Sequence, residues 1–321
     1  MKPSESKRTR AEVRALVASL MALAALVGVA FWLVTVPVLL NPAEIAPLSS
    51  ADAGRGARIF AAGGCASCHA ATGAKGPARL VLGGGVPLVT QFGTFHAPNI
   101  SPDPVHGIGA WSLADFANAM QRGVDPEGRH LYPAFPYGSY KRMTKGDVAD
   151  LYAYLRTLPA VAGDAPAHDL RFPFTIRRGI GLWKLAFLHD NRPIVTLPAN
   201  ASAAAHAGQY LVEGPGHCGE CHTPRLLRGA GGLDHARWLA GAASAEGKGR
   251  VPNITPSADG IGKWSEAEIA EYLATGFTPD YDSVGGSMVE VQANMAMLTP
   301  DDRAAIAAYL KLVPAVAKQA K

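Results

Sequence analysis

The chain has 321 residues, of which 48% are hydrophobic and 17% charged, with 35 glycines, 24 prolines and only four cysteines. This composition excludes a disordered chain, a collagen-like chain and a disulfide-rich scaffold, and the length suits about two domains. The net charge of +4 comes mainly from residues 1–14, where five side chains are basic and two are acidic. Because the remaining residues are close to neutral, we expect no nucleic acid among the partners.

An uncharged segment follows this basic tail. Residues 15–40 contain no charged side chain, and an apolar helix of about 20 residues already spans a bilayer. We predict a cytoplasmic tail at 1–14, a transmembrane signal anchor at 15–40 and a linker at 41–50. Basic residues before a span stay in the cytoplasm, so we expect a single-pass protein of the inner (cytoplasmic) membrane with its later domains in the periplasm. A long cleaved signal peptide is the alternative.

The four cysteines lie in two C-x-x-C-H motifs. This motif is typical of c-type haem attachment, in which both thiols form thioethers with the haem and the histidine binds its iron. We therefore predict two covalently bound haem c groups. Disulfides, redox-active or structural, and a Cys₄ zinc site are the alternatives, but a zinc site would leave both histidines without a role. The motifs are Cys65-Ala66-Ser67-Cys68-His69 and Cys218-Gly219-Glu220-Cys221-His222.

The first motif lies in a predicted α-helical domain at 51–160. After Trp111, Ser112 with Asp115 predicts a capped helix that ends at Gly123. Thr144 with Asp147 predicts the start of a last helix. Met143 directly precedes that helix, after a proline-rich loop, and is the predicted second axial ligand beside His69. Its rival, Met120, lies inside the earlier helix, where core packing explains it.

Residues 161–205 interrupt the pattern. They contain Pro166, Pro173, Pro193 and Pro198 together with four large aromatic side chains. Such a segment is more typical of a connector that packs against the domains, or against a partner, than of a free linker. The aromatic residues are Phe172, Phe174, Trp183 and Phe187.

A second domain is predicted at 206–316, as a repeat of the first at an offset of about 153 residues. Pro-Asn-Ile at 98–100 returns at 252–254, and Gly-Ile-Gly-x-Trp-Ser at 107–112 returns at 260–265. The capped helix returns from Ser265 with Glu268 to Gly276, and the last helix starts at Thr299 with Asp302. No alternating strand pattern is evident, so the fold is predicted to be all-α.

The second domain does not repeat the methionine position. Leu298 stands where the first domain has Met143. Met288 follows Gly285-Gly286-Ser287, which would let the backbone approach a haem face, and it is the predicted ligand beside His222. Methionine ligation gives low-spin, closed iron of relatively high potential, which suits electron transfer. The remaining candidates in this domain are Met295 and Met297.

Polar residues that recur in the two domains have two equally good interpretations. Their side chains would either hydrogen-bond haem propionates or stabilise loops and the core. The other histidines are better explained as loop or propionate-side residues than as ligands. The polar candidates are Asn99, Trp111, Tyr132, Asn253 and Trp264.

These motifs together resemble the cytochrome c subunits of membrane-bound periplasmic dehydrogenases, such as alcohol and gluconate dehydrogenases. The similarity runs from about residue 50 to 315. It rests on Asn99-Ile100, Gly107-Ile108-Gly109 with Trp111-Ser112, Leu-Tyr-Pro-Ala-Phe-Pro-Tyr at 131–137, Met143-Thr144, and Gly-His-Cys-Gly-Glu-Cys-His-Thr-Pro-Arg at 216–225.

The resemblance implies covalent haems, histidine and methionine ligation, and electron passage from a catalytic partner to quinone or another carrier. It also implies Met143 and Met288 as ligands. In one respect the chain departs from the pattern, because those subunits typically carry three C-x-x-C-H motifs and this chain carries two. We expect the N-terminal anchor to provide the membrane attachment that a third domain gives elsewhere.

The sequence thus predicts a tandem of two cytochrome c-type haem domains behind an N-terminal transmembrane helix. The predicted function is electron transfer, without catalysis, from a periplasmic dehydrogenase to quinone, a cytochrome or an oxidase of the respiratory chain. A dihaem c-type peroxidase is the alternative, but it needs one iron with an open position, and methionines in both domains count against it. A haem-based sensor is a third possible function, but nothing in the chain resembles a signalling domain.

Overall fold

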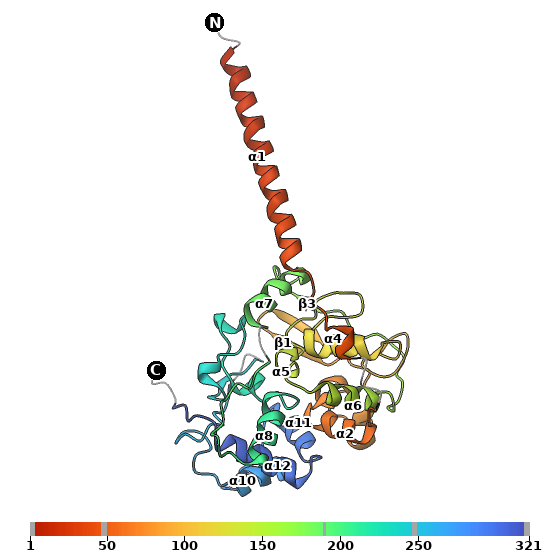
Figure 1. The fold of residues 1–321 in the computed structure, drawn as a ribbon, viewed down its shortest axis with the longest axis vertical. Coiled ribbons are helices and arrows are strands. Elements are labelled where there is room, and N and C mark those ends of the chain that lie inside the picture. Colours follow the sequence, from red (N-terminus) through yellow and green to blue (C-terminus); the bar gives the residue numbers. More distant parts are fainter. Residues whose placement is uncertain (1–3, 46–49, 189–190, 246–248, 318–321) are drawn as a thin grey trace.

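A long helix projects from a body made of two helical halves (Figure 1). The computed structural model describes residues 4–45, 50–188, 191–245 and 249–317; residues 1–3 of the predicted tail and 46–49 of the predicted linker lie outside them. Helix α1 (Ser4–Val34) starts inside the basic tail and ends before the predicted boundary at Leu40. Its apolar part, Arg10–Val34, is long enough to cross a membrane and is not buried against the body. Such a helix fits a membrane anchor or a signal sequence.

The first half is built on a crossing of two helices, α2 (Ala53–Ala62) and α6 (Lys145–Leu155). Gly56 of α2 lies directly on the α6 backbone, where a Cβ atom would overlap the carbonyl oxygen of Asp150. The crossing therefore needs glycine at this position. Three more helices complete this half: α3 (Cys65–His69), α4 (Leu113–Arg122) and α5 (Tyr137–Tyr140).

The second half repeats this crossing with α8 (Ala203–Glu213) and α12 (Pro300–Leu310). Gly208 takes the place of Gly56, because its Cβ would overlap the carbonyl oxygen of Ala305. The same arrangement in both halves confirms that the chain is a structural repeat. The other helices of this half are α9 (Gly219–His222), α10 (Glu266–Thr275) and α11 (Met288–Met295).

The predicted helix caps are confirmed. Ser112 and Ser265 each form a capping box with the acidic residue three positions later, at the starts of α4 and α10. These helices end at Gly123 and Gly276, whose φ values of 60° and 81° are accessible to glycine at little cost. The side chains of Thr144 and Thr299 accept hydrogen bonds from backbone N–H groups at the starts of α6 and α12.

Short β-strands accompany the predicted helices. An antiparallel sheet of order β1-β2-β3 joins β1 (Pro87–Thr90), β2 (Gly93–His96) and β3 (Asp169–Leu170), and a second pairs β4 (Ala242–Ala243) with β5 (Arg250–Val251). Strands of two to four residues are too short to show a clear alternation in sequence. The chain remains mostly helical, as predicted.

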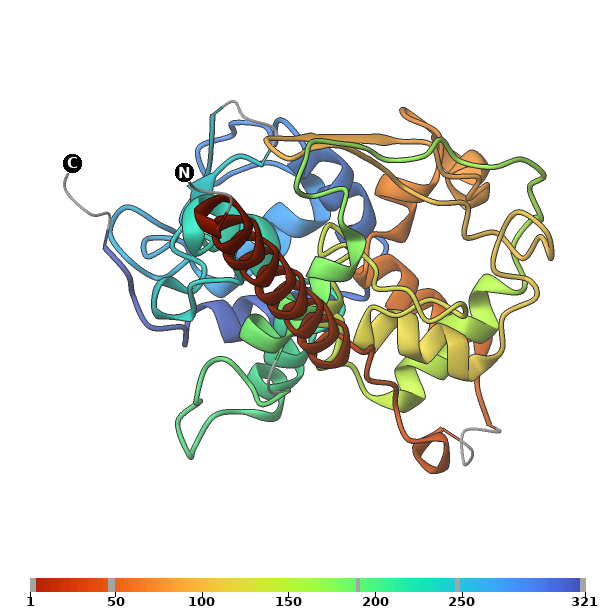
Figure 2. The same cartoon turned by 90° about the horizontal axis from the view of Figure 1, so that it is seen from above.

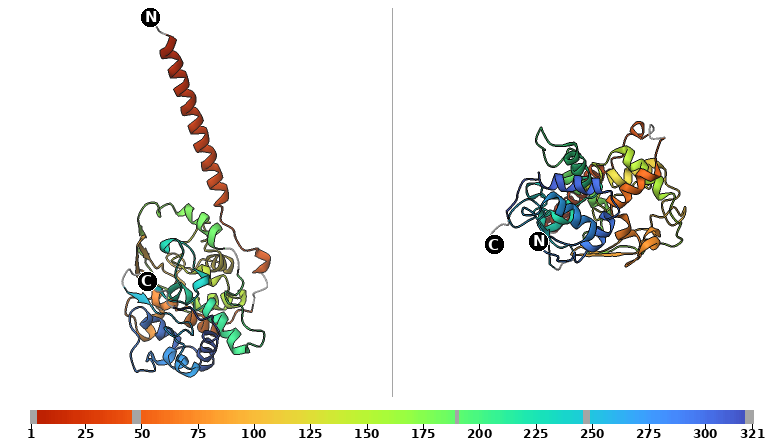
Figure 3. Two further views of the ribbon diagram at one scale, coloured as in Figure 1. Left: turned by 90° about the vertical axis from the view of Figure 1, so that its left-hand side faces the viewer. Right: turned by 90° about the horizontal axis from the view of Figure 1, so that it is seen from below.

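The connector contains the remaining long element, α7 (Ile180–Phe187), which lies at the end of the body next to α1 (Figures 1 and 3). Strand β3 also belongs to the connector and pairs with β2 of the first half. The described residues also form five short 3₁₀ helices: η1 (Pro42–Glu44), η2 (Gly76–Leu80), η3 (Arg177–Gly179), η4 (Leu227–Gly229) and η5 (His235–Arg237).

The two halves lie side by side and contact each other directly (Figure 2). Arg58 of α2 pairs with Asp302 of α12, with 2.6 Å between Nη2 and Oδ1. Arg79 of η2 pairs with Glu290 of α11 at the same N–O distance. These ion pairs are partly buried, so the halves form one body.

Candidate haem-binding sites

Each C-x-x-C-H motif folds into a short helix beside the helix crossing of its half. Gly64, with φ of 57°, makes the turn from α2 into α3. None of the four described cysteines forms a disulfide. Burial raises the pKa of Cys65 and that of Cys218 to about 12, and the neighbouring cysteine of each motif adds to the shift. Cys65 and Cys218 are therefore protonated thiols at neutral pH before any haem is attached to them.

The two motif histidines make the same hydrogen bond. Nδ1 of His69 lies 2.8 Å from the carbonyl oxygen of Pro98, and Nδ1 of His222 lies 2.8 Å from that of Pro252. Burial lowers the pKa of both rings, against a smaller opposite effect of these hydrogen bonds. A neutral ring that donates from Nδ1 leaves Nε2 as the free, iron-binding nitrogen. This geometry fits a haem ligand.

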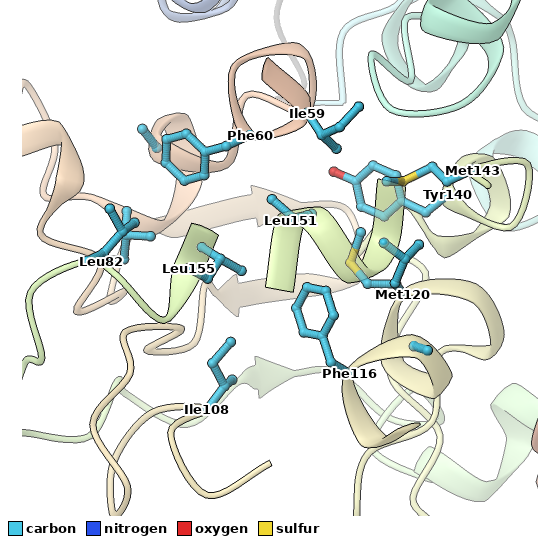
Figure 4. Close-up of a cluster of buried hydrophobic side chains, with 14 of the residues drawn as sticks. Ile59, Phe60, Leu82, Ile108, Phe116, Met120, Tyr140, Met143, Leu151 and Leu155 are labelled. Carbon is cyan, nitrogen blue, oxygen red and sulfur yellow. The ribbon is translucent and has the colours of Figure 1, made fainter. Parts of the chain in front are cut away.

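Met143 lies inside the core of the first half. It is only 4% exposed and belongs to one cluster with Phe116, Met120 and Tyr140, against which Cys65 packs. In Figure 4, Met143, Met120 and Tyr140 lie together, at the opposite end of the cluster from Leu82. The Met143 carbonyl oxygen accepts a hydrogen bond from Nε2 of Gln121, at 2.7 Å. The structure thus brings Met143 and a motif cysteine into one cluster.

In the second half the structure separates the three methionine candidates. Met295 is buried in the core cluster, and Met288, the first residue of α11, packs against that cluster together with Cys218. Met297 is 59% exposed and stands outside it. Leu298 is buried in the cluster, at the position equivalent to Met143. Met288 and Met295 therefore remain as candidates that share a cluster with a motif cysteine.

Most of the recurrent polar side chains bind protein groups. The Asn99 amide donates to the carbonyl oxygen of Val161 at 2.7 Å, and the Asn253 amide to that of Val316 at 2.8 Å. The hydroxyl of Tyr132 donates to the carbonyl oxygen of Phe174, at 2.9 Å. These contacts support the loop-packing interpretation for these three residues. Trp111 and Trp264 pack at the edges of the two core clusters.

The donor groups fit haem better than zinc. Among the described residues, no group of three or more His, Cys, Asp and Glu side chains is arranged to hold a metal ion. The two cysteine pairs therefore do not join into a Cys₄ site. Each motif instead presents two thiols and one oriented imidazole, which is the donor set for covalent haem attachment.

The segment before Met143 contacts the second motif, and sequence reasoning missed this junction. The hydroxyl of Ser139, in α5, donates to Oε1 of Glu220 in the second motif, at 2.8 Å. Arg225 pairs with the same carboxylate. The rings of Tyr140 and His217 meet edge to face, 5.5 Å between centroids. No local sequence pattern links positions 139 and 220. The sequence signal available for a contact here was Glu220, an acidic residue inside a C-x-x-C-H motif.

A cavity of about 590 Å³ is lined in part by Pro98. Its lining includes His96, His168, Tyr132 and Arg177, but none of Cys65, Cys68, His69 and Met143. The cavity is therefore distinct from the predicted haem site of the first half.

Comparison with known proteins gives consistent matches. The family described as Cytochrome c matches residues 53–159 and 205–313. A "Diheme cytochrome c-type" protein of Cereibacter sphaeroides is 52% identical over 92% of this chain and 97% of its own length. The fructose dehydrogenase cytochrome subunit of Gluconobacter japonicus is 36% identical over 87% of this chain and 56% of its own. The cytochrome c subunit of alcohol dehydrogenase (quinone) of Gluconacetobacter polyoxogenes is 36% identical over 85% and 58%. The chain thus spans little more than half the length of these two dehydrogenase subunits.

Proposed function

The chain belongs to the cytochrome c family, with one family domain in each half, and from this premise we propose that it relays electrons from a dehydrogenase to the respiratory chain. Two covalently bound haem c groups follow from the two domains and from the dihaem relative. The protein is an electron carrier rather than an enzyme, because its relatives are cytochromes and cytochrome subunits. Those relatives lend no support to the peroxidase alternative.

In this proposal Cys65, Cys68, His69 and Met143 hold the first haem, and Cys218, Cys221, His222 and Met288 hold the second. A haem held in this way supplies a single-electron change of its iron. The proline carbonyls orient the two histidine rings, and the cluster around Met143 excludes water from its sulfur. The domain limits of 51–160 and 206–316, with the connector at 161–205, belong to the same proposal.

The observation that carries the relay is the junction between the two sites. Ser139 stands four residues before Met143, and it hydrogen-bonds Glu220 inside the second motif. Tyr140 and His217 pack against each other at the same place. A relay needs its two centres close and fixed, because electron transfer slows steeply with distance. The junction supports such an arrangement, since it joins the ligand loop of one site to the attachment motif of the other.

We place the protein in the inner membrane as a single-pass protein, with α1 as an uncleaved anchor and both haem domains in the periplasm. The long apolar helix and the basic residues before it support this orientation. The electron donor is a periplasmic dehydrogenase, as the names of the relatives suggest. The acceptor is a quinone, another cytochrome or an oxidase.

The test is a spectroelectrochemical titration of the purified full chain. We expect two low-spin haems at positive potentials, each with the weak red charge-transfer band of methionine-ligated ferric iron. The variants His69→Ala and His222→Ala should each lose the low-spin spectrum of one haem, whereas His235→Ala keeps both. A high-spin haem that reacts with peroxide in the unaltered chain would instead make the protein an enzyme.

A further inference from the structure

Helix α7 is attached to the end of α1. The guanidinium of Arg178, next to α7, donates to Thr35 Oγ1 and to the Trp32 carbonyl oxygen, both at 2.9 Å, and lies 4.0 Å from the centroid of the Trp32 ring. Gly181, in the first turn of α7, packs so closely that a Cβ atom would lie 2.6 Å from Cβ of Thr35. The connector therefore holds a set position at the point where α1 enters the body (Figures 1 and 3).

Helix α7 carries apolar side chains on its outward face as well as on its inward face, where the Trp183 indole donates a hydrogen bond to the carbonyl oxygen of Ala230. Its charged residue, Lys184, lies against the body and donates to the carbonyl oxygens of Arg122 and Gly123, at 2.6 and 2.7 Å. Leu182 and Leu185 are exposed, the latter at 57%. A helix that packs on a soluble domain turns its apolar side chains inward and its charges outward. Here Lys184 shares the inward side with Trp183, and the two leucines face away from the body.

The segment before α7 extends this apolar surface. Phe172 is 80% exposed, and Phe174 and Ile176 are exposed as well. Together with Leu182 and Leu185 they form what we call the connector face. Large exposed apolar patches are uncommon on soluble monomers and mark a contact with a partner or a membrane. The face therefore needs an occupant.

The position and charge of the connector face identify its occupant. The face is continuous with α1 through Arg178 and Thr35, and the exposed residues Val36, Val38 and Leu39 follow α1 directly. Arg171, Arg177 and Arg178 lie along the same segment. Aromatic and aliphatic side chains bordered by arginines suit the boundary between lipid headgroups and acyl chains, where anionic lipids attract the cations.

We propose that the connector face lies in the lipid interface of the outer leaflet of the membrane that α1 spans. The protein is then attached at two places, by the spanning helix and by the connector that lies on the surface. Two attachments prevent the body from swinging about the end of α1, so both haem domains keep a fixed orientation to the membrane. This inference rests on the anchor role given to α1 in the proposed function.

The test uses nitroxide spin labels on the full haem-containing chain in vesicles of phosphatidylethanolamine and phosphatidylglycerol. Leu185→Cys and Phe172→Cys place labels on the connector face. Tyr281→Cys is the matched control, because Tyr281 is 89% exposed and follows α10, at the end of the molecule remote from α1 (Figure 1). The native cysteines are not labelled, since they are bound to haem. Collision with oxygen reports lipid, and collision with a water-soluble nickel chelate reports water.

We expect the labels at 185 and 172 to be several-fold more accessible to oxygen than to the nickel chelate, and the label at 281 to show the opposite. Unchanged haem spectra would show that the labelled chains are folded. Alkaline carbonate extraction separates the two proposals. If the chain is washed off the vesicles, both the anchor and this inference fail. If the chain stays and the labels at 185 and 172 are in water, only this inference fails, and shielding of those labels on addition of the dehydrogenase would identify a protein partner instead.

Discussion

His69 and His222 each contact a proline carbonyl through Nδ1, and this hydrogen bond leaves Nε2 free for the predicted bond to iron. The predicted second axial ligands are less uniform, because the two halves place these methionines on different elements. Met143 precedes α6, whereas Met288 begins α11. The ligand roles are therefore best tested residue by residue, each against a second methionine of the same core cluster.

The variant Met143→Leu should lower the potential of the first haem. A thioether favours ferrous iron, so its loss is expected to shift the potential down by about 0.1–0.3 V, within the ~0.8 V range that axial ligands cover. Spectroelectrochemistry should also show loss of one charge-transfer band. Met120→Leu is the control, because it is a volume-conserving core exchange that costs less than about 1.5 kcal/mol. If the potential of the first haem changes in Met120→Leu and not in Met143→Leu, Met120 is the axial ligand and Met143 is the core residue.

The same design applies to the second haem with Met288→Leu and Met295→Leu. We expect only Met288→Leu to remove the methionine band of this haem and lower its potential by about 0.1–0.3 V. Met295 is buried in the core, so Met295→Leu should change the free energy of unfolding by less than about 1.5 kcal/mol and leave the potential as it is. If Met295→Leu removes the methionine band, the ligand is Met295, the last residue of α11, and not Met288.

At the scale of elements, each half depends on a crossing of its first and last long helices. Gly56 and Gly208 permit this crossing, because at both positions the backbone of the opposite helix occupies the place of a Cβ atom. A wider side chain would push the helices apart and disturb the core clusters that contact the predicted ligands. The glycines therefore support the haem sites from a distance.

The variant Gly208→Ala should lower the free energy of unfolding by about 2–3 kcal/mol, as overpacking of a tight contact does. Gly146→Ala is the matched control. Gly146 lies in the first turn of α6, where a Cβ would meet only the side chain of Thr144 at 3.8 Å, so alanine is expected to be neutral or to stabilise by ~0.5–1 kcal/mol. Thermal unfolding followed by circular dichroism compares the two. Equal transition temperatures would show that α8 and α12 can separate at no cost.

At the scale of the molecule, the two halves are held together by ion pairs and by the junction at Glu220. Arg58 with Asp302 joins α2 to α12, and Arg79 with Glu290 joins η2 to α11. The hydrogen bond from Ser139 to Glu220 adds a contact between α5 of the first half and the second motif. The arrangement of the two haems is thus a property of the interface between the halves.

This interface should weaken in acid. Burial acts to raise the pKa of Asp302, but hydrogen bonds from Arg58 and Thr299 outweigh it and hold the pKa below its usual 3.8. A carboxyl whose folded-state pKa is lowered stabilises the fold above its unfolded-state pKa and loses that contribution as the pH falls through the folded-state value. We therefore expect Asp302→Asn to cost about 1–2 kcal/mol at pH 7 and progressively less as the pH falls through the folded-state pKa of Asp302, measured by thermal unfolding.

Asp115→Asn is the control for this prediction. Asp115 occupies the same capping-box position at the start of α4 as Asp302 does in α12. The substitution therefore removes the same helix cap without an ion pair between the halves. If both variants lose equal stability at pH 7, the pair with Arg58 contributes nothing.

The sequence by itself determined the features that depend on neighbouring residues. Three such features were the C-x-x-C-H motifs, the repeat, and the helix caps at Ser112, Thr144, Ser265 and Thr299. Each has a sequence pattern that is compatible with few other structures. These local rules were enough to predict the cytochrome c family, two haems and a mostly helical fold behind an apolar helix. The axial ligands stay predictions, although Met143 is buried in the cluster against which Cys65 packs, and the partly buried Met288 packs against the same cluster as Cys218.

Only the tertiary structure decided how distant parts meet. Glu220 contacts a residue 81 positions away, and Arg58 pairs with one 244 positions away. The pairing of the short strands and the outward direction of the α7 leucines likewise depend on the segments that pack beside them. No spacing rule encodes such contacts, because they arise when separate core clusters and helix crossings come together in space. The relation between the two halves belongs to this second class, and so do the contacts on which the proposed membrane attachment of the body rests.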